Sequence, residues 1–250
     1  MRQFYTSQLN PQSKQFAQIL TQQTRMGGQP LYSLGIAADP PNALHDALLA
    51  VQAVKLDRPE YFWLGHHWRA RSETNHSGCR VEVYDEYRYP AKVCLKLVRA
   101  AKQEAMTIVR SICSRAERPA DREELLFDYL YSVPYGDPED LQSHNILGLL
   151  LDQSAVCEGK AAAFTYLSGL MGIESIVIHG QGKGSGHAWN GVWLDGKFLE
   201  LDCTWGPRYF NRHPHEMRGT HTPDPQFCLP NSLKKEVNYG SLHTRTHHSA

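Results

Sequence analysis

The sequence has no excess of either charge, because 26 lysine and arginine residues balance 26 aspartate and glutamate residues. A chain of balanced charge has no general attraction to nucleic acid or to an anionic membrane, so we expect neither as a partner. The sequence also has no apolar run as long as a membrane span, and its polar first residues do not resemble a signal peptide. We therefore expect a cytoplasmic protein; no feature of the sequence indicates its oligomeric state.

The six cysteines include no C-x-x-C pair, and no acidic loop has the spacing of an EF-hand. We expect free thiols in a reducing compartment, no metal site and no cofactor. A zinc site that uses Cys157, Cys203 and histidines is the alternative. The histidines number 13, and we interpret the six after residue 212 as part of a polar tail: His213, His215, His221, His243, His247 and His248.

Apolar residues make up 41% of the chain, which is enough for an ordinary core. Helical patterning over 10–26, 43–56 and 91–114 and alternation over 79–89 predict three helices and a strand. The sequence indicates a domain boundary near residue 117. The predicted organisation is a mainly helical N-terminal extension (1–117), a catalytic core (118–230) and a flexible tail (231–250). Alternatively, the N-terminal part wraps the core as one domain.

Two local patterns in the core predict further structure. Asp121 and Glu124 have the spacing of a capping box, which predicts a helix that starts at Asp121. The apolar run within 174–179 predicts a strand, and the glycine-rich segment 180–186 after it fits no phosphate-binding motif. We interpret that segment as a mobile loop that leads into a site.

Cys157 opens a segment rich in glycine and alanine. Ser154 is a suitable N-cap for a helix that would run to Gly172, with Cys157 at its third position. The free amides and the positive end of the helix dipole favour a thiolate there, and the Cys157 amide is a candidate oxyanion donor. A cysteine in a helix is more often a small buried apolar residue, so this feature alone does not establish a nucleophile.

His187 and Asp202 lie on two strand-like runs that Asp195-Gly196 separates, which predicts a two-residue hairpin. In a type I′ hairpin Leu194 faces Lys197, and His187 and Asp202 become diagonal neighbours on one face. Such neighbours are about 7–8 Å apart at the backbone, within reach of a side-chain hydrogen bond. Cys157, His187 and Asp202 therefore have the residue types and order of an activated cysteine nucleophile.

These segments resemble the transglutaminase-like cysteine superfamily, as bacterial stand-alone members present it. The resemblance covers residues 154–206, with AVCEGKA at 155–161, GHAWN at 186–190, DGKF at 195–198 and LDCTW at 201–205. It implies an α+β papain-like fold in which a nucleophile helix packs on an antiparallel sheet, and a catalytic triad of Cys157, His187 and Asp202. For the oxyanion or the cleft wall it leaves four candidates open: Tyr135, Gln142, His144 and Trp189.

The predicted activity is cysteine-dependent acyl chemistry on a protein or peptide substrate. The Cys157 thiolate would form a thioester from a carboxamide or a peptide bond, which an amine (transglutaminase) or water (cysteine peptidase) then releases. The sequence does not distinguish these acceptors. The alternative is an inactive transglutaminase-like module that binds a protein or peptide in the same cleft.

Overall fold

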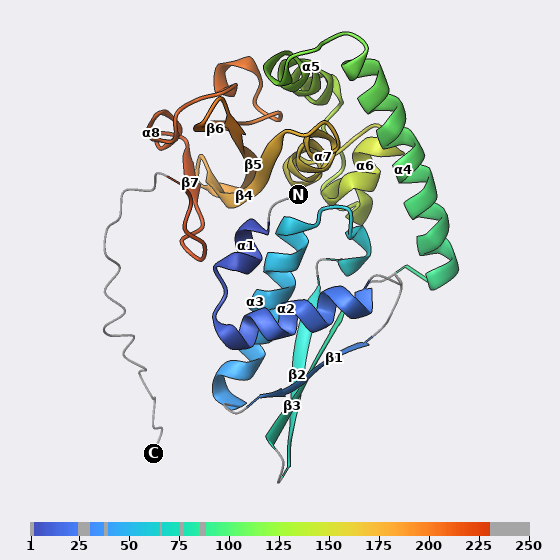
Figure 1. Cartoon of the computed structure of the whole chain (residues 1–250), viewed down its shortest axis with the longest axis vertical. Coiled ribbons are helices and arrows are strands. Elements are labelled where there is room, and N and C mark those ends of the chain that lie inside the picture. Colours follow the sequence, from blue (N-terminus) through green and yellow to red (C-terminus); the bar gives the residue numbers. More distant parts are fainter. Residues whose placement is uncertain are drawn as a thin grey trace.

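The computed structural model describes residues 3–24, 31–37, 40–65, 67–75, 78–85 and 89–230. It has an α+β fold with two antiparallel sheets, which confirms the predicted fold class (Figure 1). Within these ranges, no helix is both long enough and apolar enough to cross a membrane. The predicted tail at 231–250 lies outside the described residues, and the domain limits stay a prediction.

The N-terminal part combines helices with a three-stranded sheet of order β1-β3-β2. The predicted helices and the predicted strand are present in the described residues, and the ends of two predictions, 25–26 and 86–88, lie outside them. The helix α3 starts at Pro40, earlier than predicted, because proline fits the first turn of a helix. Two strands were not predicted, since Gly35 and a bulge interrupt one and the other is mostly polar. The elements are α1 (Phe4–Ser7), α2 (Pro11–Thr24), β1 (Leu31–Ala37), α3 (Pro40–Asp57), η1 (Phe62–Leu64), β2 (Trp68–Asn75) and β3 (Gly78–Asp85).

Helices make up the next part of the chain. The predicted capping box is wrong: the helix starts at Pro119, and the Asp121 carboxylate accepts from the Arg118 guanidinium at 2.8 Å. Proline at the first helical position has already set the start two residues earlier. The elements are α4 (Ala91–Cys113), α5 (Pro119–Ser132), η2 (Leu141–His144), α6 (Ile146–Leu150) and α7 (Cys157–Leu170).

The second sheet has the order β6-β5-β4-β7, and α7 packs against it: Asn190 of β5 donates to the Ala161 carbonyl at 2.9 Å. The predicted mobile loop at 180–186 is wrong. Most of it is strand, and Lys183 and Gly184 make a tight turn with φ of 50° and 87°. The elements are β4 (Glu174–Gly182), β5 (Ser185–Leu194), β6 (Lys197–Leu201), η3 (Pro207–Tyr209), α8 (Pro214–Met217) and β7 (His221–Pro223).

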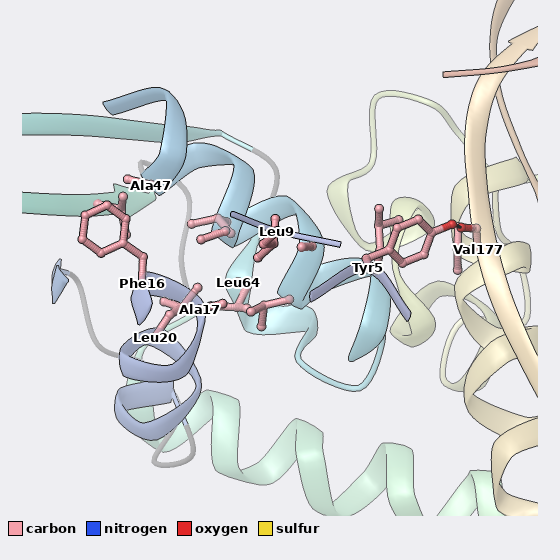
Figure 2. Packing of buried hydrophobic residues seen from close by; sticks show 14 of the residues in the cluster. Tyr5, Leu9, Phe16, Ala17, Leu20, Ala47, Leu64 and Val177 are labelled. Carbon is pink, nitrogen blue, oxygen red and sulfur yellow. Dashed lines mark hydrogen bonds between the residues drawn. The ribbon is translucent and has the colours of Figure 1, made fainter. Parts of the chain in front are cut away.

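One hydrophobic core joins the N-terminal helices to this second sheet. Figure 2 shows Phe16, Leu20 and Leu64 packed within the N-terminal part and Tyr5 reaching the strand that carries Val177. The buried Tyr5 hydroxyl donates to the Val177 carbonyl of β4. The N-terminal part is therefore anchored on the sheet that carries the site described next.

Candidate active site

Cys157 is the first residue of α7, which places it earlier in the helix than predicted. The Ser154 cap is wrong: Val156 is the N-cap, without a side-chain bond. Hydrogen bonds to other segments hold 154–156 extended; for example, the Val156 amide donates to the Ser143 carbonyl at 3.1 Å. The first intrahelical bond comes from the amide of Lys160. Cys157 therefore still lies in the first turn, at the positive end of the helix dipole.

His187 and Asp202 are brought together as the hairpin predicts. Leu194 pairs with Lys197, and Asp195 and Gly196 both have positive φ, as a type I′ turn requires. The strand β6 ends at Leu201, so Asp202 is the first residue beyond it. The Nε2 of His187 and the Oδ2 of Asp202 are 2.8 Å apart, and both side chains are almost completely buried.

The Cys157 side chain is a hydrogen-bond partner of His187. Burial opposes ionisation of the thiol, but the hydrogen bond and the charge of His187 outweigh it and lower the pKa of Cys157. For His187, burial is likewise outweighed by Asp202 and Cys157, which raise its pKa to about 9. The pair therefore favours a thiolate beside an imidazolium.

Asp202 accepts hydrogen bonds on both carboxylate oxygens. The Oδ1 atom accepts from the amides of Thr204 and Trp205, at 2.7 and 3.2 Å. The Oδ2 atom contacts His187 and the Nε2 of His221, the latter at 3.2 Å. Burial alone would raise the pKa of Asp202, but the hydrogen bonds from the two histidines outweigh burial and lower the pKa to about 2. The carboxylate is thus ionised at neutral pH.

His221 was assigned to a polar tail, and that assignment is wrong. The residue is completely buried in β7, where it pairs with Gly182 of β4. The sequence shows only a histidine in a polar, histidine-rich segment. Its site is formed by a strand pairing between segments about forty residues apart, which local patterning does not reveal.

The His187 ring is fixed from two sides. The indole of Trp205 stacks on it with ring centres 4.4 Å apart and an interplanar angle of 15°. On the facing strand, a Cβ atom at Gly182 would lie 2.8 Å from the His187 ring, so that position accepts only glycine without a shift. Together these contacts hold the imidazole between Cys157 and Asp202.

The four oxyanion or cleft candidates have different surroundings. Tyr135 is half exposed, forms a bridge with Ala155, and its hydroxyl is a hydrogen-bond partner of Cys157. The main-chain amide of Gln142 donates to the Asp140 carboxylate, and this bond stabilises the start of η2. His144 contacts Glu158 at 3.3 Å, and Trp189 is buried with its indole donating to Glu200 at 2.9 Å. The Tyr135 hydroxyl is therefore the best placed of these groups to act beside the Cys157 sulfur.

A cavity of about 530 Å³ opens beside the thiol. Its lining includes Cys157, His187 and Ala188, together with His144 and Glu158. The amide of Ala188 also bonds Cys157. The Cys157 side chain is therefore reached from this cavity, whereas Asp202 is not among the residues that line it.

A metal ion has one candidate position in the described ranges, formed by His187, Asp202 and His221, whose ligand atoms lie within 4.8 Å of one another. Both histidines already contact the same carboxylate oxygen, at 2.8 and 3.2 Å. An ion would have to replace these hydrogen bonds, so the geometry fits a hydrogen-bonded cluster better than a metal centre.

Cys157, His187 and Asp202 thus form a connected cluster of a thiol, an imidazole and a carboxylate on an α+β fold. Residues 106–203 match the model of the Transglutaminase-like superfamily. This match confirms the resemblance seen in the motifs over that part of the chain.

Among curated proteins, human kyphoscoliosis peptidase is 24% identical over 157 residues, which cover 50% of this chain and 24% of the human protein. The mouse protein of that name is 27% identical over 122 residues, covering 38% of this chain and 18% of the mouse protein. The chain thus spans about a quarter or less of these relatives.

Two solved structures are also similar. A TGase has a TM-score of 0.39 and 15% identity, over 58% of this chain and 46% of that one. The periplasmic domain of TgpA from Pseudomonas aeruginosa has a TM-score of 0.35 and 16% identity, over 51% and 53%.

Alkylation of the thiols tests the electrostatics of the site. We expect iodoacetamide to label Cys157 at pH values below those at which the exposed Cys228 reacts, because His187 stabilises the thiolate. The variant His187→Ala should move the Cys157 profile to higher pH and leave Cys228 unchanged. Mass spectrometry of the labelled peptides measures both profiles; coincident profiles for the two thiols would contradict the ion pair.

Proposed function

We propose that the protein is an enzyme that transfers or hydrolyses acyl groups of protein or peptide substrates through a thioester at Cys157. The proposal rests chiefly on one observation: the Cys157 thiol lies at the start of α7 and contacts a histidine whose other side meets a buried carboxylate. A thiol, an imidazole and a carboxylate in this sequence of contacts are the parts of an activated cysteine nucleophile.

In the first half of the reaction the thiolate attacks the carbonyl carbon of a carboxamide or peptide bond. A C–S bond forms, and the carbonyl electrons move to the oxygen. The Cys157 amide in the first turn of α7 and the Tyr135 hydroxyl are the groups we assign to that oxyanion. When the intermediate collapses, the C–N bond breaks and His187 gives its proton to the departing ammonia or amine.

In the second half an acceptor attacks the thioester. The lone pair of a water molecule or an amine bonds to the carbonyl carbon, and His187, now neutral, takes a proton from that acceptor. Collapse breaks the C–S bond and restores the thiolate beside the imidazolium. Water gives an acid by hydrolysis, and an amine gives a new amide by transfer. Asp202 keeps the imidazole oriented throughout and stabilises its charged form.

The alternative is an inactive module that binds a peptide in the same cleft. The arrangement of His187 favours the enzyme over this alternative, because peptide binding alone requires neither a lowered thiol pKa nor a carboxylate behind the imidazole.

Glutamine-containing peptides test the proposed activity with and without a primary amine. We expect release of ammonia or a peptide fragment, with a thioester on Cys157 trapped by acid quench. Cys157→Ala should abolish turnover, and Asp202→Asn should lower kcat by about 10²- to 10⁴-fold, since the imidazole loses its orientation. The variant Cys228→Ala, which changes an exposed thiol, is the control. Peptide binding without turnover or thioester would favour the inactive module instead.

A further inference from the structure

A second cavity, of about 390 Å³, lies next to the cleft that contains Cys157. The two cavities share three lining residues, His144, Glu158 and His179. Glu158 directly follows Cys157 in the chain, so a lining residue of the second cavity is the sequence neighbour of the thiol. A substrate whose carbonyl lies at the sulfur therefore has a neighbouring group within reach of this cavity.

The walls of the second cavity are largely apolar, and most of them come from the N-terminal part. The segment from α3 to the start of β2 supplies one side, and α7 and β4 supply the other. Two of its aromatic residues, Tyr61 and Phe62, pack against Trp63 from behind, with ring centres 5.0 and 5.2 Å from that of Trp63, which stiffens this wall. The apolar lining includes Leu48, Val51, Leu56, Tyr61, Phe62 and Trp68.

The charges at the junction of the two cavities are balanced. Glu158 lies between two histidines, with His144 at 3.3 Å and His179 at 3.7 Å. The hydrogen bond to Glu158 outweighs the effect of burial and raises the pKa of His144 to about 9, so the pair is a carboxylate beside an imidazolium. Lys55 and Arg58 also line the second cavity, and the Arg58 guanidinium lies 3.6 Å from the Glu60 carboxylate. The paired junction itself does not select strongly for substrate charge, so the apolar walls are the main basis for selectivity.

We propose that this cavity is a specificity pocket that takes one large apolar or aromatic side chain of the peptide substrate, next to the acyl group that reaches Cys157. This inference rests on the proposed function. A volume of about 390 Å³ accommodates an aromatic side chain, and apolar walls favour such a side chain over a polar one because its burial removes apolar surface from water.

Peptides with a fixed glutamine test the pocket. One flanking position at a time is varied over Trp, Phe, Leu, Ala, Asp and Lys, and Kd is measured for the Cys157→Ala protein. We expect Trp, Phe or Leu at one position to bind about tenfold or more tightly than Ala. Leu48→Trp, which fills the pocket from an exposed position of α3, should remove that preference.

The matched control is Leu95→Trp, since Leu95 is an exposed leucine on α4 and does not line the pocket. It should retain the preference. Equal binding of all peptides, or a preference that survives Leu48→Trp, would overturn the pocket. Because the Cys157→Ala protein performs no chemistry, this result stands apart from any failure of the acyl-transfer assay.

A second inference concerns His221 and rests on a different observation. Its ring is completely buried, and both nitrogens have partners: Nε2 contacts Asp202 at 3.2 Å, and Nδ1 contacts the Thr220 hydroxyl at 2.9 Å. An ionised carboxylate only accepts, so Nε2 is the donor in the first contact. Aromatic rings enclose the histidine, with Trp205 and Trp189 centred 4.6 and 4.9 Å away.

We infer that His221 is a positioning residue that holds the Oδ2 atom of Asp202 in place for His187. Because the two imidazoles share that oxygen, the bond to His221 fixes the carboxylate in the position in which it meets His187. The titratable groups placed against the His221 ring are His187 of β5, Asp202 after β6 and Tyr209 of η3.

Alkylation of Cys157 across pH reports on this role without a substrate. We expect His221→Ala to slow labelling at neutral pH about tenfold and to shift the pH profile. The variant His221→Gln should restore most of the rate, because its amide nitrogen is able to donate from nearly the position of Nε2. The exposed His215→Ala on α8 is the control.

A residue that only fills space would lower the unfolding temperature in both His221 variants and leave the pH profile unchanged. That result, or an equal loss of labelling in the Gln and Ala variants, would overturn the positioning role. Since labelling requires only the thiolate, a protein inactive toward every peptide would still give a clear answer.

Discussion

The site depends on one buried carboxylate, that of Asp202. Its side chain is almost completely enclosed, so it stays ionised only because four donors surround it: two main-chain amides and two imidazoles. An unpaired charge in such a place would be strongly destabilising. Removing either imidazole therefore takes a donor from the carboxylate, and the effect reaches the thiol on the far side of His187.

The fold brings these donors together from separate parts of the chain. The type I′ hairpin places His187 and Asp202, α7 presents Cys157, and β7 returns across β4 to insert His221. Trp205 stacks on His187 and lies close to His221, so it fixes the spacing of the two rings. The N-terminal part is tied to β4 through Tyr5 and supplies most of the wall of the proposed specificity pocket. On the two proposals made above, the core provides the reactive groups, and the N-terminal part selects the substrate side chain that lies beside them.

The sequence was most informative where the structure is local. The Asp195-Gly196 turn sets the register of its hairpin, so the proximity of His187 and Asp202 followed from strand geometry. The helix after Cys157 followed from its small and apolar residues, but its start did not. The carbonyls of Ser143 and Pro134, which come earlier in the chain, accept from the amides of 155–156 and hold this segment extended, so Ser154 does not cap the helix. His221 was missed for the same reason, since β7 has only three residues and its pairing partner is remote.

The central claim is that His187 is an imidazolium beside a Cys157 thiolate. The ¹⁵N chemical shifts of His187, followed by NMR across pH, test it most directly. The account predicts that both ring nitrogens of His187 carry protons at pH 7 and that one proton is lost near pH 9. A neutral His187 at pH 7, next to a thiol that ionises only at its ordinary pKa, would contradict it.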